Sequence, residues 1–189
     1  MTTHSVGMKS ETYYEPEPKP MAMHIFFDTE FWTVGNSVEL ISIGAVREDG
    51  EMFYAERSEF DWSKVPADDW LQTHVRPHLQ GGDTVMTDAV IREKLRAFAP
   101  KRTQWWAYYG SYDWFAMCVL MGGFMNLPQG WNKCCFDIKQ YQMFVEPGMD
   151  LPKKYAIEHH ALNDAHWNKQ AFLRIRQAAI EAKVAQWDF

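Results

Sequence analysis

Long apolar runs and a signal segment are both missing from this sequence of 189 residues. No stretch reaches the roughly 18 to 20 consecutive apolar residues that a membrane-spanning helix requires, so we expect no membrane partner. The first residues also lack the apolar segment of a secretory signal peptide, and we therefore expect a cytoplasmic protein.

Cysteine is scarce, and the three that occur are Cys118 and the adjacent pair Cys134 and Cys135. Adjacent cysteines rarely bridge each other, and the chain has no C-x-x-C spacing that would hold zinc. We expect three reduced thiols in the core and no structural zinc site.

Positive charge is in deficit, because 19 Lys and Arg residues face 25 Asp and Glu residues, for a formal net charge of −6. Coating a nucleic acid non-specifically depends on accumulated Lys and Arg, so any nucleic acid must be gripped locally. Apolar residues make up 47% of the chain and aromatic residues 15%. These fractions predict a globular protein with one well-formed core.

The order of the predicted elements indicates a mixed sheet. Residues 1–22 contain alternating Glu and Pro and predict a flexible tail, which leaves residues 23–189 as one domain. A hairpin first, then alternating helix and strand, predicts an α/β fold with a mixed five- or six-stranded sheet flanked by helices. The predicted strands are residues 23–28, 38–49, 51–60, 103–110 and 132–138, and the predicted helices are residues 87–99, 111–122 and 162–184.

Two acids, Asp28 and Glu30, are expected at the tip of the first predicted strand, in the stretch HIFFDTEFW. Positions i and i+2 of a strand point to the same face, so both carboxylates should project together where the strand leaves the core. Like charges this close favour their protonated forms unless a cation lies between them. A D-x-E pair alone is expected by chance in about half of such chains, so the remaining ligands decide.

Two further stretches supply acids. Asp113 lies in the first turn of the helix after the fourth strand, where α/β folds bind ligands. Taken alone, Asp113 is interpreted equally well as an acid that stabilises the helix dipole. His159 and Asp164 form an H-x-A-x-x-D pattern at the start of the last helix, which chance produces in only a few per cent of such chains. The joint order of the three patterns favours one shared site.

Four carboxylates at one point would form a site for two hard cations, Mg²⁺ or Mn²⁺. Two such ions about 3.5 to 4 Å apart stabilise the attacking and leaving oxygens of a phosphoryl displacement. In this interpretation Asp28 bridges the ions, and Glu30 and Asp164 complete the shell of one. Asp113 holds the second ion through water. His159 is the general base, because an unperturbed imidazole titrates close to neutral pH.

The stretches FFDTEF, YGSYD and HHALNDA, in this order and spacing, resemble the three motifs of the DEDDh family of 3′-5′ exonucleases. The resemblance covers about residues 23–175 and implies a ribonuclease H-like fold. Neighbouring stretches are most similar to a bacterial and phage branch, the exoribonuclease AS group, which implies cleavage of RNA 3′ overhangs, adenylate preference and a homodimer. Ser42 stands where many proofreading relatives carry Glu or Gln, so their base and sugar preferences are not carried over. The five family positions are filled by Asp28, Glu30, Asp113, His159 and Asp164.

We expect the substrate to be a single-stranded 3′ end, RNA by the branch resemblance, and the product to be a nucleoside 5′-monophosphate. Exposed rings beside the carboxylates would stack on an unpaired base, whereas Trp105, Trp106 and Tyr108 are expected in the core. Lys153, Lys169 and Arg174 are further candidates for phosphate contacts. The expected substrate-binding residues are Thr29, Phe31, Trp32, Tyr109 and Lys154.

Two other functions remain open. A 3′-5′ DNA exonuclease such as a proofreader would use the same catalytic residues, and only contacts to the 2′-hydroxyl distinguish it. A nucleotide-binding module without turnover would keep the fold, but the complete carboxylate set and His159 argue against it. An endonuclease of ribonuclease H type also uses clustered acids, but the H-x-A-x-x-D spacing does not fit it.

Overall fold

The computed structural model of this protein describes residues 22–154 and 159–182. Nearly all of the predicted tail lies outside the described residues, as do the last residues of the predicted final helix. Among the described residues, no helix is both long and apolar enough to cross a membrane. The strands are β1 Met23–Val34, β2 Ser37–Arg47, β3 Met52–Arg57, β4 Val85–Met86, β5 Thr103–Ala107 and β6 Trp131–Asp137, and the helices are α1 Trp70–His74, α2 Asp88–Phe98, α3 Ser111–Leu120, α4 Ile138–Val145 and α5 Ala161–Glu181.

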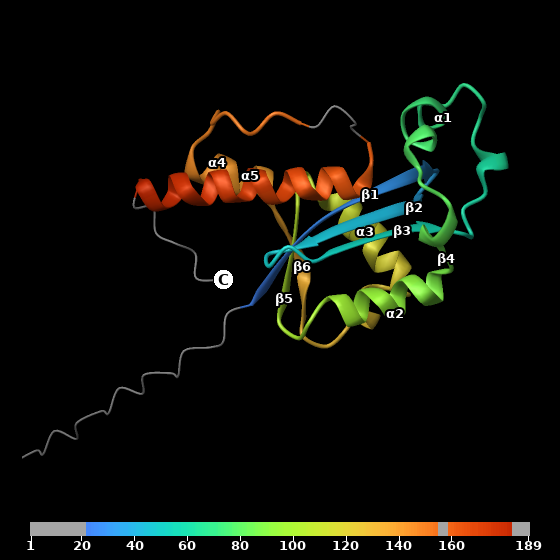
Figure 1. The fold of residues 1–189 in the computed structure, drawn as a ribbon, viewed down its shortest axis with the longest axis horizontal. Coiled ribbons are helices and arrows are strands. Elements are labelled where there is room, and N and C mark those ends of the chain that lie inside the picture. Colours follow the sequence, from blue (N-terminus) through green and yellow to red (C-terminus); the bar gives the residue numbers. More distant parts are fainter. Residues whose placement is uncertain (1–21, 155–158, 183–189) are drawn as a thin grey trace, which may run out of the picture.

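The six strands form one mixed sheet in the order β4-β3-β2-β1-β5-β6. The β1, β2 and β3 strands pair antiparallel, whereas β5 runs parallel to β1 and β6 runs parallel to β5. Helices α4 and α5 cover one face of the sheet, and α2 and α3 cover the other (Figure 1). The predicted mixed sheet flanked by helices is confirmed. The prediction missed the two-residue strand β4 and the helix α4.

Strand β1 is longer than predicted. It pairs with β2 from Ile25, opposite Arg47, to its end at Val34, opposite Ser37. The carboxylates therefore lie in the middle of a strand and not at its tip. On its other side β1 pairs with β5 only as far as Phe26. The sheet is thus open on that side beyond Phe26, where the chain turns from β5 into α3.

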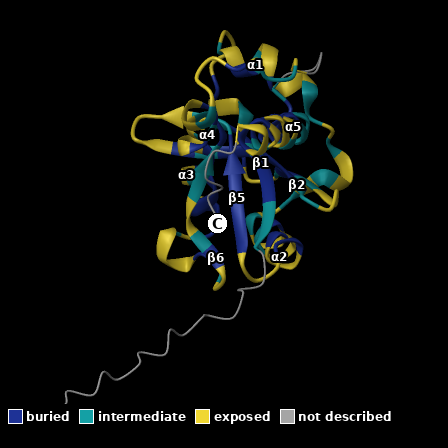
Figure 2. Ribbon diagram, turned by 90° about the vertical axis from the view of Figure 1, so that its left-hand side faces the viewer, coloured by how far each residue is buried: buried dark blue, intermediate teal, exposed yellow. Residues whose placement is uncertain are grey.

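The core lies on both faces of the central strands, which Figure 2 colours largely as buried. Alternation along the strands sends Phe27 and Trp105 towards α2 and α3, and Phe26 and Trp106 towards α5. The core positions predicted for Trp105 and Trp106 are confirmed, while Tyr108 is half-buried against the α5 side.

The cysteine prediction is wrong in one respect. All three cysteines are free, and Cys118 is buried, but Cys134 is exposed and Cys135 is half-buried. Strand β6 is the last strand of the sheet, so it has a neighbour on one side only, and its side chains are less covered than those of β5.

Residues 60–79 between β3 and α2 form a small satellite layer. Its side chains build a separate core around Ile41 of β2, with Phe60, Val65 and Leu71 among its members. Pro66 and Pro77 keep its helices short, since proline interrupts a helix interior. The layer packs beside the half of β1 that carries the carboxylates, and Trp32 packs against its core.

Candidate active site

Helix α5 begins directly on the strand pair that carries the first two acids. Gly44 of β2 lies opposite Asp28, and a Cβ at Gly44 would lie 2.2 Å from the backbone nitrogen of Leu162. Only glycine therefore permits this approach of helix and sheet. Asn168, one turn after Asp164, donates a hydrogen bond to the Phe27 carbonyl at 2.8 Å and fixes the helix on β1.

Three of the four predicted carboxylates meet. Asp28, Glu30 and Asp164 each offer an oxygen, and these oxygens all lie within 4.8 Å of one another. Asp113 approaches from α3 on the other face. Its Oδ1 accepts hydrogen bonds from the Thr29 backbone nitrogen at 2.8 Å and the Thr29 hydroxyl at 2.7 Å. Thr29 lies between Asp28 and Glu30 in the chain, so all four acids belong to one neighbourhood.

Burial and mutual repulsion raise the pKa values of these acids. Burial, followed by Asp113, Glu30 and Asp164, raises the pKa of Asp28 well above its ordinary value. Burial, then the neighbouring carboxylates of Asp164 and Asp113, raises the pKa of Glu30 to about 8. The pKa of Asp113 rises to about 6 through burial, although its hydrogen bonds from Thr29 oppose the rise. The group needs bound protons or a bound cation to offset its charge.

Among the residues that the structure describes, one ammonium group borders the cluster. Lys154 Nζ lies 3.3 Å from Asp164 Oδ1 and 5.4 Å from the centroid of the Trp167 ring. The indole nitrogen of Trp167 donates to the Pro152 carbonyl at 2.8 Å, which fixes the segment that carries Lys154. A single Lys leaves most of the carboxylate charge uncompensated. The cluster offers only carboxylate oxygens, and this donor set fits a hard divalent cation such as Mg²⁺ or Mn²⁺.

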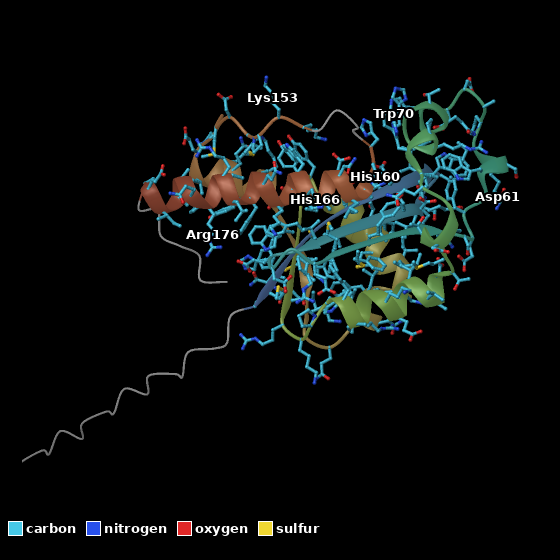
Figure 3. All side chains as sticks on the ribbon, in the orientation of Figure 1. Asp61, Trp70, Lys153, His160, His166 and Arg176 are labelled. Carbon is cyan, nitrogen blue, oxygen red and sulfur yellow. The ribbon has the colours of Figure 1, made fainter. Side chains whose placement is uncertain are left out.

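The other predicted phosphate contacts lie elsewhere. Lys153 is exposed and points into solvent (Figure 3). Lys169 Nζ donates to the carbonyls of Arg47 and Glu48 at 3.0 and 2.9 Å, so it closes the β2–β3 turn and is not free for a phosphate. Arg174 is exposed on α5, about 15 Å along the helix axis from Asp164 at 1.5 Å per residue.

His159 lies immediately beside the cluster. Its backbone nitrogen donates to Asp164 Oδ2 at 3.0 Å, and its φ of 61° is in the left-handed region. Non-glycine residues rarely adopt this conformation, and they gather at functional sites. The neighbouring His160 is buried instead, with its ring stacked on Tyr54 at 4.6 Å. The structure thus separates the two histidines of the HHALNDA stretch.

The predicted stacking rings have different surroundings. Phe31 is half-buried and stacks on Tyr112 of α3 with ring centroids 5.6 Å apart. Trp32 packs edge-on against Phe60 at 6.4 Å as part of the satellite layer. Tyr109 is 64% exposed, with a φ of 56°, at the end of β5.

A hollow of about 310 Å³ lies between β1 and α1, and sequence reasoning missed the α1 side of it. Residues 61–79 showed only short helical signals broken by prolines. The signal available in the sequence was Asp69 followed by Trp70, because Asp often precedes the first residue of a helix. The hollow is lined by Thr29, Glu30, Phe31, Trp32, Thr33, Asp69, Trp70 and Leu71.

The raised pKa of Glu30 predicts how stability depends on pH. Between pH 4.5, the ordinary pKa of Glu, and pH 8, the folded metal-free protein holds a proton that the unfolded chain has lost. Glu30 should therefore make the free energy of unfolding fall as pH rises through this window, by up to about 1.4 kcal/mol per pH unit for this one group. Saturating Mg²⁺ or Mn²⁺ should remove the slope, because the cation replaces the proton.

Urea unfolding at pH 5, 6, 7 and 8, in chelator and in Mn²⁺, measures this dependence. The variant Glu30→Gln should have a smaller slope in chelator, since its amide does not titrate. Curves that are identical with and without divalent cation would contradict a cation site at these carboxylates.

Comparison with known proteins gives one family and one fold. A model of the 3′-5′ exoribonuclease Rv2179c-like domain matches residues 23–176. The 3′-5′ exoribonuclease Rv2179c of Mycobacterium tuberculosis H37Rv is 34% identical over 152 residues, which cover 76% of this chain and 87% of the relative. The 3′-5′ exoribonuclease MT2234.1 from strain CDC 1551 gives the same values.

Among solved structures, exonuclease I from Methylocaldum szegediense aligns with a TM-score of 0.59 at 12% identity over 87% of this chain. Exonuclease I of E. coli in complex with a dT13 oligonucleotide aligns with a TM-score of 0.56 at 14% identity over 86% of this chain. This chain spans 41% and 43% of the length of these two structures. They confirm the predicted ribonuclease H-like fold.

Proposed function

Because the chain belongs to the 3′-5′ exoribonuclease Rv2179c-like domain family, we propose that it hydrolyses phosphodiester bonds at single-stranded 3′ ends of RNA and releases nucleoside 5′-monophosphates. The predicted DEDDh exonuclease resemblance is confirmed at the level of the family. The observation that carries the proposal is the meeting of Asp28, Glu30 and Asp164 within 4.8 Å, with Asp113 bound to the intervening Thr29.

We propose two Mg²⁺ or Mn²⁺ ions per site, held by Asp28, Glu30 and Asp164, with Asp113 contributing through water. When bound, such ions stabilise the charge that develops on the attacking and leaving oxygens. The raised pKa values of Asp28 and Glu30 support the proposal, because burial comes first among their causes and the repulsion between carboxylates, which a divalent cation removes, comes next.

His159 acts in the proposal as the general base that removes a proton from the attacking water. Its backbone hydrogen bond to Asp164 places it at the edge of the carboxylate cluster. In the proposal Lys154 contacts the phosphate next to the scissile bond, and its position 3.3 Å from Asp164 supports this role. Phe31, Trp32 and Tyr109 remain proposed contacts for unpaired bases, and Thr29 supports Asp113.

RNA is preferred over DNA in this proposal because the relative at 34% identity is named an exoribonuclease. A DNA exonuclease is the second candidate, since the fold is shared with exonuclease I structures that contain a DNA oligonucleotide. The test uses 5′-labelled RNA and DNA of the same sequence with 3′ overhangs, in Mg²⁺, in Mn²⁺ and in chelator.

The expected result is a ladder of products shortened from the 3′ end of RNA, in divalent cation only. Faster shortening of DNA than of RNA would overturn the substrate class, and laddering that survives chelation would overturn the role of the metal. The variant Asp28→Asn serves as a control for contaminating nucleases.

A homodimer is part of the proposal. After the first turn, which carries Ser111 and Asp113, helix α3 is apolar on all sides, yet Tyr112, Phe115 and Val119 are 57%, 47% and 50% exposed. A helix that is apolar on all sides is usually buried, so a partner protomer covering these side chains is a consistent explanation. The mass of the protein in solution tests it.

The expected cytoplasmic location also stays a prediction.

A further inference from the structure

Trp70 is a large aromatic side chain that the fold leaves exposed. It is the first residue of α1, which Asp69 begins by accepting a hydrogen bond from the Leu71 backbone nitrogen at 2.9 Å. Leu71 enters the core of the satellite layer and is 8% exposed, whereas Trp70 is 47% exposed. The layer therefore does not need the indole of Trp70 for its packing.

Trp70 borders the hollow that reaches the carboxylate cluster. Glu30 of the cluster and Phe31 line the β1 side of this hollow, and Trp70 lines the α1 side. Figure 3 shows Trp70 on α1 at the end of the molecule where α5 starts. The volume of about 310 Å³ is at the lower end of the range for small-ligand sites and suits one nucleobase with part of its sugar.

Two histidine rings contact the indole from different directions. The His74 ring stacks on it with centroids 4.4 Å apart and planes inclined by 6°. The His159 ring lies 4.5 Å away with its plane inclined by 82°. The two histidine centroids are 6.4 Å apart, so they lie at roughly a right angle as seen from Trp70. His74 thus covers one indole face, the plane of the His159 ring is nearly perpendicular to the indole, and 47% of Trp70 stays exposed.

The Trp70 and His74 pair is fixed by its own helix. His74 Nδ1 lies 3.0 Å from the Trp70 carbonyl, and the Thr73 hydroxyl lies 2.7 Å from the same nitrogen. Leu71 and Val75 pack into the satellite core and so fix α1 in place. By contrast, the His159 ring contacts the two rings of this pair. Trp70 is therefore the fixed partner against which His159 is placed.

We propose that Trp70 has two tasks: its exposed indole stacks on the base of the 3′-terminal nucleotide, and its contact with the His159 ring positions that imidazole. The inference rests on the proposed function, because it takes His159 as the general base. A base stacked in the hollow restrains the indole, and the indole restrains the imidazole. Trp70 is thus a binding and positioning residue that couples base recognition to proton transfer.

The first experiment separates stacking from positioning by removing the base. Single-turnover rates and KM are measured on RNA with an ordinary 3′-terminal nucleotide and on RNA whose 3′-terminal residue is an abasic ribose. Trp70→Ala should lower kcat/KM for ordinary RNA roughly 5- to 100-fold, the range that loss of one base–aromatic stack gives. Trp70→Phe, which keeps a ring, should retain most of the activity. Ordinary RNA should lose its advantage over abasic RNA in Trp70→Ala.

The second experiment tests whether Trp70 acts through His159. On abasic RNA no stack is possible, so any loss of kcat in Trp70→Ala must come from positioning. That loss should be present when His159 is intact and absent when the same substitution is made in His159→Ala. A loss that persists in the His159→Ala background, or no loss of kcat on abasic RNA with His159 intact, would overturn the proposal.

Trp62→Ala is the matched control, because Trp62 packs in the same satellite layer but does not line the hollow. It should reduce stability without changing the ratio of rates on ordinary and abasic RNA. If Trp70→Ala folds poorly, Trp70→Leu keeps an apolar side chain and removes the stack. A wild-type protein that shortens neither RNA would instead refute the proposed function, so the two failures are distinguishable.

Discussion

Asp28→Asn is expected to abolish RNA cleavage and, at the same time, to stabilise the metal-free protein. The amide keeps the shape of the side chain but gives up the charge at the centre of the proposed cation site. Bound divalent ions contribute several kcal/mol to the transition state, so the rate should fall roughly a thousand-fold or more. Stability should rise because the folded state raises the pKa of Asp28, and its ionised form near neutral pH therefore opposes folding.

Single-turnover cleavage in Mn²⁺ and urea unfolding in chelator measure the two effects on the same preparation. Asp83→Asn is the matched control, because Asp83 is exposed and is not among the charges that shift the pKa of Asp28 or Glu30. It should change neither quantity. Substantial cleavage by Asp28→Asn would contradict the assignment of Asp28 to the metal site.

His159→Ala should slow cleavage by roughly 10²- to 10⁴-fold, the usual range for loss of a general base. The carboxylates are untouched by this change, so Mn²⁺ should still stabilise the variant against urea as it does the wild type. His166→Ala is the matched control, because His166 lies on α5 and contacts Met52 at the turn end of β3. Equal rates for the two variants would remove His159 from the mechanism, and loss of the Mn²⁺ effect would show that His159 supports the metal site instead.

The sequence predicted that Asp28, Glu30 and Asp164 lie close together, because the signal of each carboxylate is local. Two acids at positions i and i+2 of a strand share a face wherever the strand lies, and an acid in the first turn of α5 is set by helix geometry. Bringing Asp28 and Asp164 together needed only the order of elements that ribonuclease H-like folds share. The spacing of apolar residues along the chain likewise predicted the order of most strands and helices.

Three features escaped prediction because long-range pairing determines them. The second half of β1 is polar and aromatic, and only its pairing with β2 keeps it extended to Val34. The register shift after Glu30 pairs Phe31 with Leu40 and Glu30 with Ser42. It leaves Ile41 as the extra residue, which enters the satellite core. The placement of α1, and with it Trp70, follows from that packing.

The contact at Gly44 has a consequence for how this protein can change. The separation between a carboxylate on the sheet and one on α5 is set by main chain against main chain, with no side chain in between. Substitutions in the C-terminal half of α5 would leave that spacing intact. The sequence of this half can therefore change without loss of enzymatic activity. A single methyl group at residue 44 would push the start of α5 away from the sheet. A substitution of this glycine should therefore disrupt helix packing and catalysis together.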